Sequence, residues 1–452
     1  FLCVASFSAT AAVGYLIFGG DDGQDRAVDI RVDEPTTAPR SGRATGTPGP
    51  RATPDTGGSN TPAPASPRLQ PTAPALSQTE SELAAVIVPT RDLRDLALRL
   101  RPGVDDVPAS VPSVVYEVGD TLTFGGSNVD DNRRFQVEAA LVYRTDVAYV
   151  WVESGKEYDG DRIARSIDTF SEKSYPTVRA FFGSEWNPGV DNDPRLHILH
   201  ATDLGRSIAG YYSSADEFSN LANEYSNQKE MFYISLEWLN RSRDYEYYET
   251  VLAHEFQHMI HWYNDRNEET WVNEGLSELA QEVAGYPPDT GFASVFASVP
   301  DTQLNTWSDN PAGNGEHYGS AYLFMAYVFQ RFGEDVTKAL VAHPANGIAG
   351  VTEALVDAGH ALTFQDVFAD WVVANYVDDP EALGLVGSYG YRQLRAPNPA
   401  VERTFRRYPI ESRTTTVRNF GAHYYELKGR GDITFRFRGE TETGLADVPR
   451  HR

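Results

Sequence analysis

A His-Glu-x-x-His string in the middle of the chain has the spacing of a catalytic metal site. His254 and His258 are four residues apart, so on a helix their imidazoles share one face and reach a single ion. Glu255 lies about 100° further round the helix, beside the ion rather than on it. There it can take a proton from a water molecule that the metal activates. These residues therefore predict hydrolysis by an activated water.

A catalytic zinc ion requires a third protein ligand and one open position. His261 is the nearest candidate, but it lies roughly 10 Å along the helix axis from His254, so it cannot converge on the same ion. Glu274 is the better candidate, because the fifteen residues after His258 allow a turn and a second helix. Glu278 follows one turn later and can accept the remaining N–H of a ligand histidine. The alternative is that both glutamates are exposed on a solvated helix.

These two segments resemble a known family. The residues that carry the resemblance are the paired histidines and a following Asn-Glu-Gly run: His254-Glu255-x-x-His258 and Asn273-Glu274-Gly275. They are similar to the gluzincin metallopeptidases of the thermolysin-like clan, and the local amino-acid sequence most resembles that of the hyicolysin-type secreted peptidases. The resemblance implies that Glu274 is the third zinc ligand and Glu278 the partner of a ligand histidine. It is specific over residues 254–278 and extends more loosely over 135–375.

The expected elements occur in the order of a zincin-like, two-lobed metallopeptidase domain. Two strands are expected at 135–143 and 147–152, followed by a helix at 163–170. Three further strands are expected at 195–201, 208–213 and 231–236, and a long helix after Asp244. We therefore expect an α+β fold with a twisted mixed sheet, an active-site helix and then a helical lower lobe. In such folds an edge strand lies antiparallel to the bound peptide, and Ala209, Gly210 and Tyr211 occupy the matching place. An ordinary interior strand is the alternative.

The resemblance also implies a hydrogen-bond donor from the lower lobe. Attack of water on an amide creates an oxyanion, and gluzincins usually stabilise it with a Tyr or His in addition to the metal. Tyr318 is the expected donor, because it stands at the start of an expected helix. His317 and Tyr322 are the alternatives, and packing in the core is the competing interpretation, which suits Tyr322 best.

Composition limits the other classes of function. The chain has 39 Lys and Arg against 64 Asp and Glu, a net charge of −25, which argues against a protein that mainly grips nucleic acid or anionic lipid. A single Cys excludes an intrachain disulfide and zinc sites built from cysteines. We expect one Zn²⁺ per chain. Asp191-Asn192-Asp193 is a weaker candidate for Ca²⁺, with a plain turn as the alternative.

The chain divides into five segments by composition. Residues 1–20 are uncharged and mostly apolar, close to the roughly 20 residues that span a bilayer, so they are interpreted as a signal anchor or a cleaved signal peptide. The next segment is rich in Pro, Thr, Ala and Gly and is expected to be a disordered linker. We expect the linker at 21–81 and the upper lobe, with the His-Glu-x-x-His helix, at 82–267. The helical lobe is expected at 268–396, and a β-rich, incomplete unit at 397–452.

The sequence thus predicts an extracytoplasmic zinc endopeptidase that acts on proteins or peptides and meets a membrane only through its N-terminal segment. It predicts no oligomeric state. An aminopeptidase of the same clan is one alternative, but such enzymes commonly hold the substrate amine with a Gly-x-Met-Glu-Asn stretch. Met231, Met259 and Met325 are the only methionines, and none lies in such a stretch. A cell-surface binding protein with a vestigial site is the other alternative, although it would be expected to lose Glu255.

Overall fold

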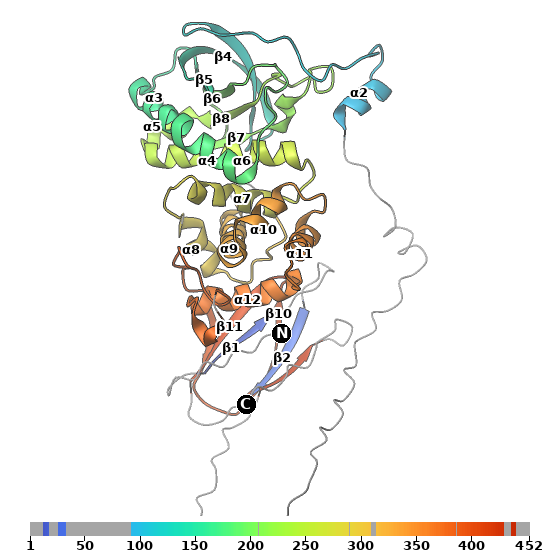
Figure 1. Ribbon diagram of the computed structural model, residues 1–452. Coiled ribbons are helices and arrows are strands. Elements are labelled where there is room, and N and C mark those ends of the chain that lie inside the picture. Colours follow the sequence, from blue (N-terminus) through green and yellow to red (C-terminus); the bar gives the residue numbers. More distant parts are fainter. Residues whose placement is uncertain are drawn as a thin grey trace, which may run out of the picture.

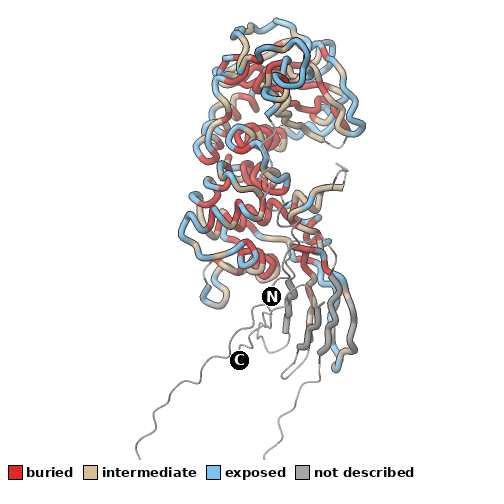
Figure 2. The backbone as a smooth tube through the Cα atoms, turned by 90° about the vertical axis from the view of Figure 1, so that its right-hand side faces the viewer, coloured by how far each residue is buried: buried red, intermediate tan, exposed pale blue. Residues whose placement is uncertain are grey.

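The computed structural model describes most of the chain in three tiers. The described residues are 12–17, 26–32, 92–206, 208–288, 290–308, 313–385, 387–428 and 435–439. An upper tier of strands and helices stands on a middle tier of helices, and a last group of strands lies below (Figure 1). Buried residues are found throughout the upper and middle tiers (Figure 2). The α+β class and a mixed sheet, as predicted, are confirmed.

The upper sheet has six strands in the order β3-β4-β5-β6-β8-β7. They are β3 (Thr121–Asn128), β4 (Arg133–Arg144), β5 (Ala148–Glu153), β6 (Leu196–Ala201), β7 (Gly210–Tyr212) and β8 (Met231–Ser235). The three central strands β5, β6 and β8 are parallel, and the flanking pairs are antiparallel. Within the described residues β7 pairs only with β8, so it is an edge strand, as predicted.

Side chains alternate along the strands, so each strand contributes residues to both faces of the sheet. Both faces are covered by hydrophobic clusters. On β5, Val150 packs in the cluster shared with the helices, whereas Tyr149 and Trp151 pack in a second cluster on the other face. In Figure 1 the helices α4 (Tyr175–Phe182) and α6 (Tyr245–Asn264) lie below the strands, and α3 (Gly160–Thr169) and α5 (Leu236–Ser242) lie at their left. A π-helical turn at Phe170–Ser174 joins α3 to α4. A short helix, α2 (Leu93–Leu100), precedes the sheet.

The long helix α6 begins where the sequence predicts. The carboxylate of Asp244 accepts a hydrogen bond from the Tyr247 amide at 3.0 Å, which satisfies one of the free N–H groups of the first turn. The helix is buried over most of its length beneath the sheet. Its burial fixes the positions of the residues that it carries, His254 and His258 among them.

The middle tier consists of helices. They are α7 (Thr270–Val283), α8 (Thr290–Ser298), α9 (Gly315–Phe332), α10 (Glu334–Val341), α11 (Gly347–Asp357) and α12 (Phe364–Val377). Two glycines let these helices approach closely. A Cβ on Gly275 of α7 would lie 2.7 Å from the Ala321 carbonyl oxygen of α9, and one on Gly319 would lie 2.0 Å from the Phe292 carbonyl oxygen. Neither contact leaves room for a side chain, so both sites require glycine.

The lower strands combine segments from both ends of the described chain. They are β1 (Ala12–Ile17), β2 (Arg26–Val32), β9 (Val401–Phe405), β10 (Ile410–Val417), β11 (Ala422–Leu427) and β12 (Phe435–Gly439), in two sheets of order β1-β11-β9 and β10-β2-β12. The sequence also predicts a β-hairpin of His423–Leu427 with Ile433–Phe437, because a Gly-containing run lies between them, and this prediction is wrong. β11 is paired on both sides by β1 and β9, so β12 pairs with β2 instead.

The predicted membrane segment and linker are only partly described. Ala12–Ile17 is strand β1 and Arg26–Val32 is strand β2. The rest of 1–20 and of 21–81 lies outside the described residues, so the anchor and linker interpretations stay predictions. No helix among the described residues combines the length and apolar character needed to span a bilayer.

The close packing at Gly275 gives a stability prediction. Gly275→Ala gains about 1 kcal/mol of helix propensity, but its methyl meets a backbone carbonyl, and overpacking of this kind typically costs about 1–3 kcal/mol. We expect a net loss of about 1 kcal/mol or more in the free energy of unfolding, measured by urea denaturation. Gly315→Ala is the control, because its added Cβ has no neighbour nearer than 3.4 Å. Equal stability of the two variants would contradict this packing argument.

Candidate metal centre

Three predicted ligands meet between α6 and α7. The ligand atoms of His254, His258 and Glu274 all lie within 4.8 Å of one another. The two histidine Nε2 atoms are 3.0 Å apart, and Glu274 Oε2 lies 3.5 Å from the first and 3.4 Å from the second. The turn between the helices thus brings Glu274 opposite the two imidazoles, as the spacing predicts.

This triangle has the size that a zinc ion requires. A tetrahedral zinc with bonds of about 2.0–2.1 Å holds its ligand atoms about 3.3 Å apart. The three observed separations of 3.0, 3.4 and 3.5 Å lie close to that value. Glu274 Oε2 is buried and faces the Nε2 atoms of both imidazoles. The residues present therefore fit a divalent ion.

The far sides of both imidazoles are also held. His254 Nδ1 lies 3.3 Å from Glu278 Oε1, as predicted for Glu278, and Gln281 donates to the other carboxylate oxygen at 2.8 Å. His258 Nδ1 hydrogen-bonds Asn273 Oδ1 and lies 3.0 Å from Ser277 Oγ. When Nδ1 carries the proton, the Nε2 lone pair is left for a metal.

The sequence reasoning assigned no role to Asn273 or Ser277. They are four residues apart, as are Glu274 and Glu278, so α7 presents two parallel pairs. One pair contacts His258 and the other contacts His254. Asn273 and Ser277 have the same i, i+4 spacing as the two glutamates, and this spacing could have identified them from the sequence as partners of a ligand histidine.

The electrostatics of the site favour positive charge. Burial opposes a charge on His254, but its hydrogen bonds with Glu274 and Glu278 hold the pKa of His254 well above its usual value. Burial alone would raise the pKa of Glu274, yet the field of His258 and hydrogen bonds from both histidines hold it well below its usual range. A buried carboxylate that stays ionised offers a divalent cation the negative charge that offsets its desolvation.

Glu255 lies beside this triangle. It is buried, and it interacts electrostatically with the three ligand side chains. Burial raises the pKa of Glu255, while His254 and His258 oppose that rise. A raised pKa suits a carboxylate that must take up a proton and release it again. The backbone of Tyr212, on edge strand β7, also opposes the rise in the pKa of Glu255, and β7 packs against α6 next to the site.

Tyr318 approaches the site from α9. Its ring centroid lies 6.4 Å from that of His254. Phe292 stacks on the Tyr318 ring at 5.0 Å and Trp307 meets it edge-on at 4.8 Å, which fixes its orientation. Burial, and then the carboxylates of Glu274 and Glu278, hold the pKa of Tyr318 well above its usual value. The phenol therefore keeps its proton and can act as a donor.

The alternative residues lie in other surroundings. His317 packs against Trp307, and burial lowers its pKa, so the ring is neutral near pH 7. Tyr322 is buried and donates to Glu282 at 3.0 Å, which fits the core role considered for it. His261 is fully buried, burial lowers its pKa to about 3, and it is not part of the ligand group.

The Asp191–Asp193 turn has protein partners for its carboxylates. Asp191 lies 3.2 Å from His197 Nε2 and 3.5 Å from Lys229 Nζ. Asp193 accepts from the Tyr149 hydroxyl at 3.0 Å and pairs with Arg195 at 3.0 Å. These contacts favour the plain turn, and the Ca²⁺ prediction stays untested.

Comparison with known proteins adds no family assignment. No model of a known protein family matches the chain, and no curated protein matches it in sequence. The resemblance to gluzincins thus stays a prediction that rests on residues 254–278.

The geometry distinguishes the two candidate third ligands. Glu274→Ala removes an oxygen that faces both Nε2 atoms, so we expect most of the zinc to be lost on dialysis. His261→Ala should retain about one zinc per chain, because that ring lies outside the ligand group. Asn273→Ala should retain zinc with an affinity about 10- to 100-fold lower, since it frees the His258 ring. Zinc content per chain, measured by atomic absorption, checks all three. Loss of zinc in His261→Ala with retention in Glu274→Ala would refute the assignment.

Proposed function

We propose that the chain is a zinc-dependent endopeptidase. The observation that carries the proposal is the meeting of His254, His258 and Glu274 at zinc-like separations, with Glu255 beside them. Two ligands and a base come from α6 and the third ligand from α7. Three protein ligands would leave a tetrahedral zinc ion one position for a water molecule.

The chain's own residues account for the proton transfers of peptide hydrolysis. When bound, zinc would polarise the water and the scissile carbonyl and so lower the barrier to attack. Glu255 accepts the proton as the water oxygen bonds to the carbonyl carbon. It then delivers that proton to the departing amide nitrogen as the C–N bond breaks. Tyr318 donates a hydrogen bond to the oxyanion from the lower lobe.

The edge strand supports a peptide as the substrate. Within the described residues β7 pairs with β8 on one side only, and β7 packs against α6, the helix that carries Glu255. An extended peptide can add to such an edge through main-chain hydrogen bonds. Because that pairing uses the backbone on both sides of the scissile bond, it favours cleavage inside a chain over removal of a terminal residue. We propose Ala209, Gly210 and Tyr211 as the residues along which the substrate lies.

The proposed place of action is outside the cytoplasm. It rests on the uncharged segment 1–20 and the Pro- and Thr-rich segment that follows. Extracellular proteins and peptides are therefore the proposed substrates.

The role of Glu255 gives the first functional prediction. Glu255→Gln keeps the size of the side chain but cannot accept the proton. We expect unchanged zinc content and melting temperature, with kcat reduced by about 10²-fold or more. An internally quenched peptide with blocked ends, assayed with and without a chelator, measures this. Wild-type turnover by a fully zinc-loaded variant would rule out Glu255 as the base.

The role of Tyr318 gives the second functional prediction. Tyr318→Phe removes only the hydroxyl and leaves the ring stacked on Phe292. Loss of one oxyanion donor costs about 10²–10³ in turnover, so kcat should fall while KM and the melting temperature change little.

His317→Ala is the matched variant for Tyr318→Phe. We expect it to stay active, because the described ring contact of His317 is with Trp307. Steady-state kinetics of both variants decide the matter. Full activity of Tyr318→Phe with a crippled His317→Ala would transfer the role to His317.

A further inference from the structure

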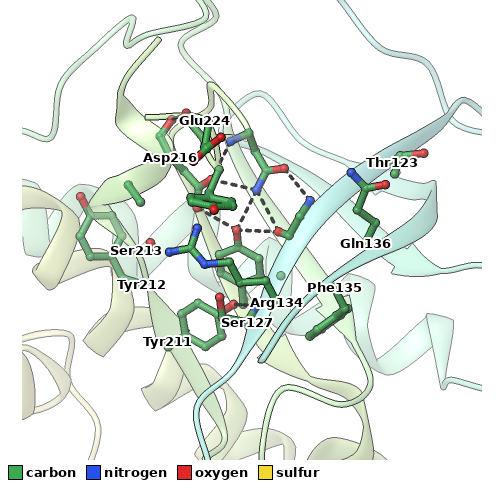
Figure 3. A pocket seen from close by; sticks show the side chains of 17 residues that line it. Thr123, Ser127, Arg134, Phe135, Gln136, Tyr211, Tyr212, Ser213, Asp216 and Glu224 are labelled. Carbon is green, nitrogen blue, oxygen red and sulfur yellow. Dashed lines mark hydrogen bonds between the residues drawn. The ribbon is translucent and has the colours of Figure 1, made fainter. Parts of the chain in front are cut away.

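A cavity of about 630 Å³ lies next to edge strand β7 and outside the metal centre. Its walls come from the β3–β4 hairpin on one side and from β7 and the following loop on the other (Figure 3). The lining includes three successive residues of the β7 segment, Tyr211, Tyr212 and Ser213. The cavity therefore runs alongside the strand on which we propose that the substrate lies.

The curl of the sheet forms this cavity. β3 and β7 are at opposite ends of the strand order, yet the Ser127 amide donates to the Tyr211 hydroxyl at 3.1 Å. Asn227 closes the floor, because its amide group hydrogen-bonds Gly125, Asp216 and the Tyr233 hydroxyl. These bonds fix the walls before a ligand enters.

A peptide added to β7 would direct side chains into this cavity. Tyr211 stacks on Tyr233 at 4.3 Å, on the cavity face of the sheet. The next residue, Tyr212, also lines the cavity, and its hydroxyl donates to Glu217 at 2.6 Å. Because side chains alternate along a strand, every second residue of an added peptide faces the same side as Tyr211.

Arg134 is the cation of this cavity. It extends from β4 into the cavity, and its Cζ lies 3.3 Å from the centre of the Tyr225 ring (Figure 3). Tyr225 covers one face of the guanidinium, but the N–H groups at its edge remain available. Within the described residues Arg134 forms no ion pair, whereas its neighbour Arg133 is paired with Asp203 and Asp131. A planar guanidinium held by an aromatic ring suits a carboxylate, which it can bind through two parallel hydrogen bonds.

Two carboxylates also line the cavity. Asp216 is buried and accepts hydrogen bonds from Asn227 and from the Tyr233 hydroxyl, so its oxygens are already used. Glu224 is exposed to solvent at the rim. The remaining lining adds further donors, among them the hydroxyls of Thr123 and Ser127 and the amide of Gln136.

We propose that this cavity is a substrate-specificity subsite for an acidic side chain, Asp or Glu, with Arg134 as the residue that determines the preference. This inference rests on the proposed function, because it places a peptide along β7. It adds a substrate class to that function: peptides with a carboxylate at one fixed distance from the scissile bond.

The test compares eight-residue peptides of Ala and Leu with blocked ends, in which Glu, Gln or Lys occupies each position in turn. At one position we expect Glu to exceed Lys by about 10- to 100-fold in kcat/KM, the range for a hydrogen bond to a charged group. Arg134→Gln should abolish this preference and Arg134→Glu should reverse it. Glu224→Gln should increase it. Arg133→Gln is the matched control and should leave it unchanged.

A binding measurement separates this inference from the proposed catalysis. Fluorescence anisotropy of the same peptides, dye-labelled, on the Glu255→Gln protein needs no turnover. Arg134-dependent binding of the Glu peptide without any cleavage by the wild type would retain the subsite and overturn the peptidase. Cleavage whose selectivity is unchanged in Arg134→Glu would overturn the subsite alone. A Lys preference that depends on Glu224, or the absence of both cleavage and Arg134-dependent binding, would also overturn it.

Discussion

The position of α7 between α6 and α9 is the constraint on which the proposed metal centre depends. α7 packs against both helices, and the bare backbone at Gly275 lets it lie against the carbonyl of Ala321. The adjacent residue, Glu274, then faces two imidazoles that α6 has already placed. Tyr318 comes from the same α9 helix, so one helix contact positions a ligand and the proposed oxyanion donor together. A shift of α7 by 1 Å would exceed the differences among the three ligand separations.

A second constraint is electrostatic. Two imidazole nitrogens 3.0 Å apart in a buried site repel unless a cation or a proton lies between them. Glu274 and Glu278 supply the negative charge that makes such a cation favourable, and Asn273 fixes the second ring. The chain as a whole carries a charge of −25, yet Arg134, which forms no ion pair with the residues that the structure describes, faces the cavity beside β7. Local placement of charge, rather than net charge, thus decides what each part of the upper lobe can bind.

Local sequence pattern could predict the metal centre because its information is local. The spacing of His254 and His258, the cap at Asp244 and the second helix that carries Glu274 all follow from periods of three to four residues. The pairing of β1 with β11, and of β2 with β12, joins segments about 400 residues apart, and no local signal encodes it. The cavity was missed for the same reason, since it exists only because the curled sheet brings β3 to β7. In the sequence Arg134 occupies a strand position like that of any exposed residue. Only its placement over the Tyr225 ring distinguishes it from other exposed arginines.

The position of the metal itself tests the account most directly. Crystals of the wild-type protein grown with zinc would be measured at X-ray wavelengths on both sides of the zinc absorption edge. The account predicts one strong anomalous peak per chain, about 2.0–2.2 Å from Nε2 of His254, Nε2 of His258 and an oxygen of Glu274, with no fourth protein ligand. A peak coordinated by His261, or a zinc-soaked crystal with no peak between α6 and α7, would contradict it.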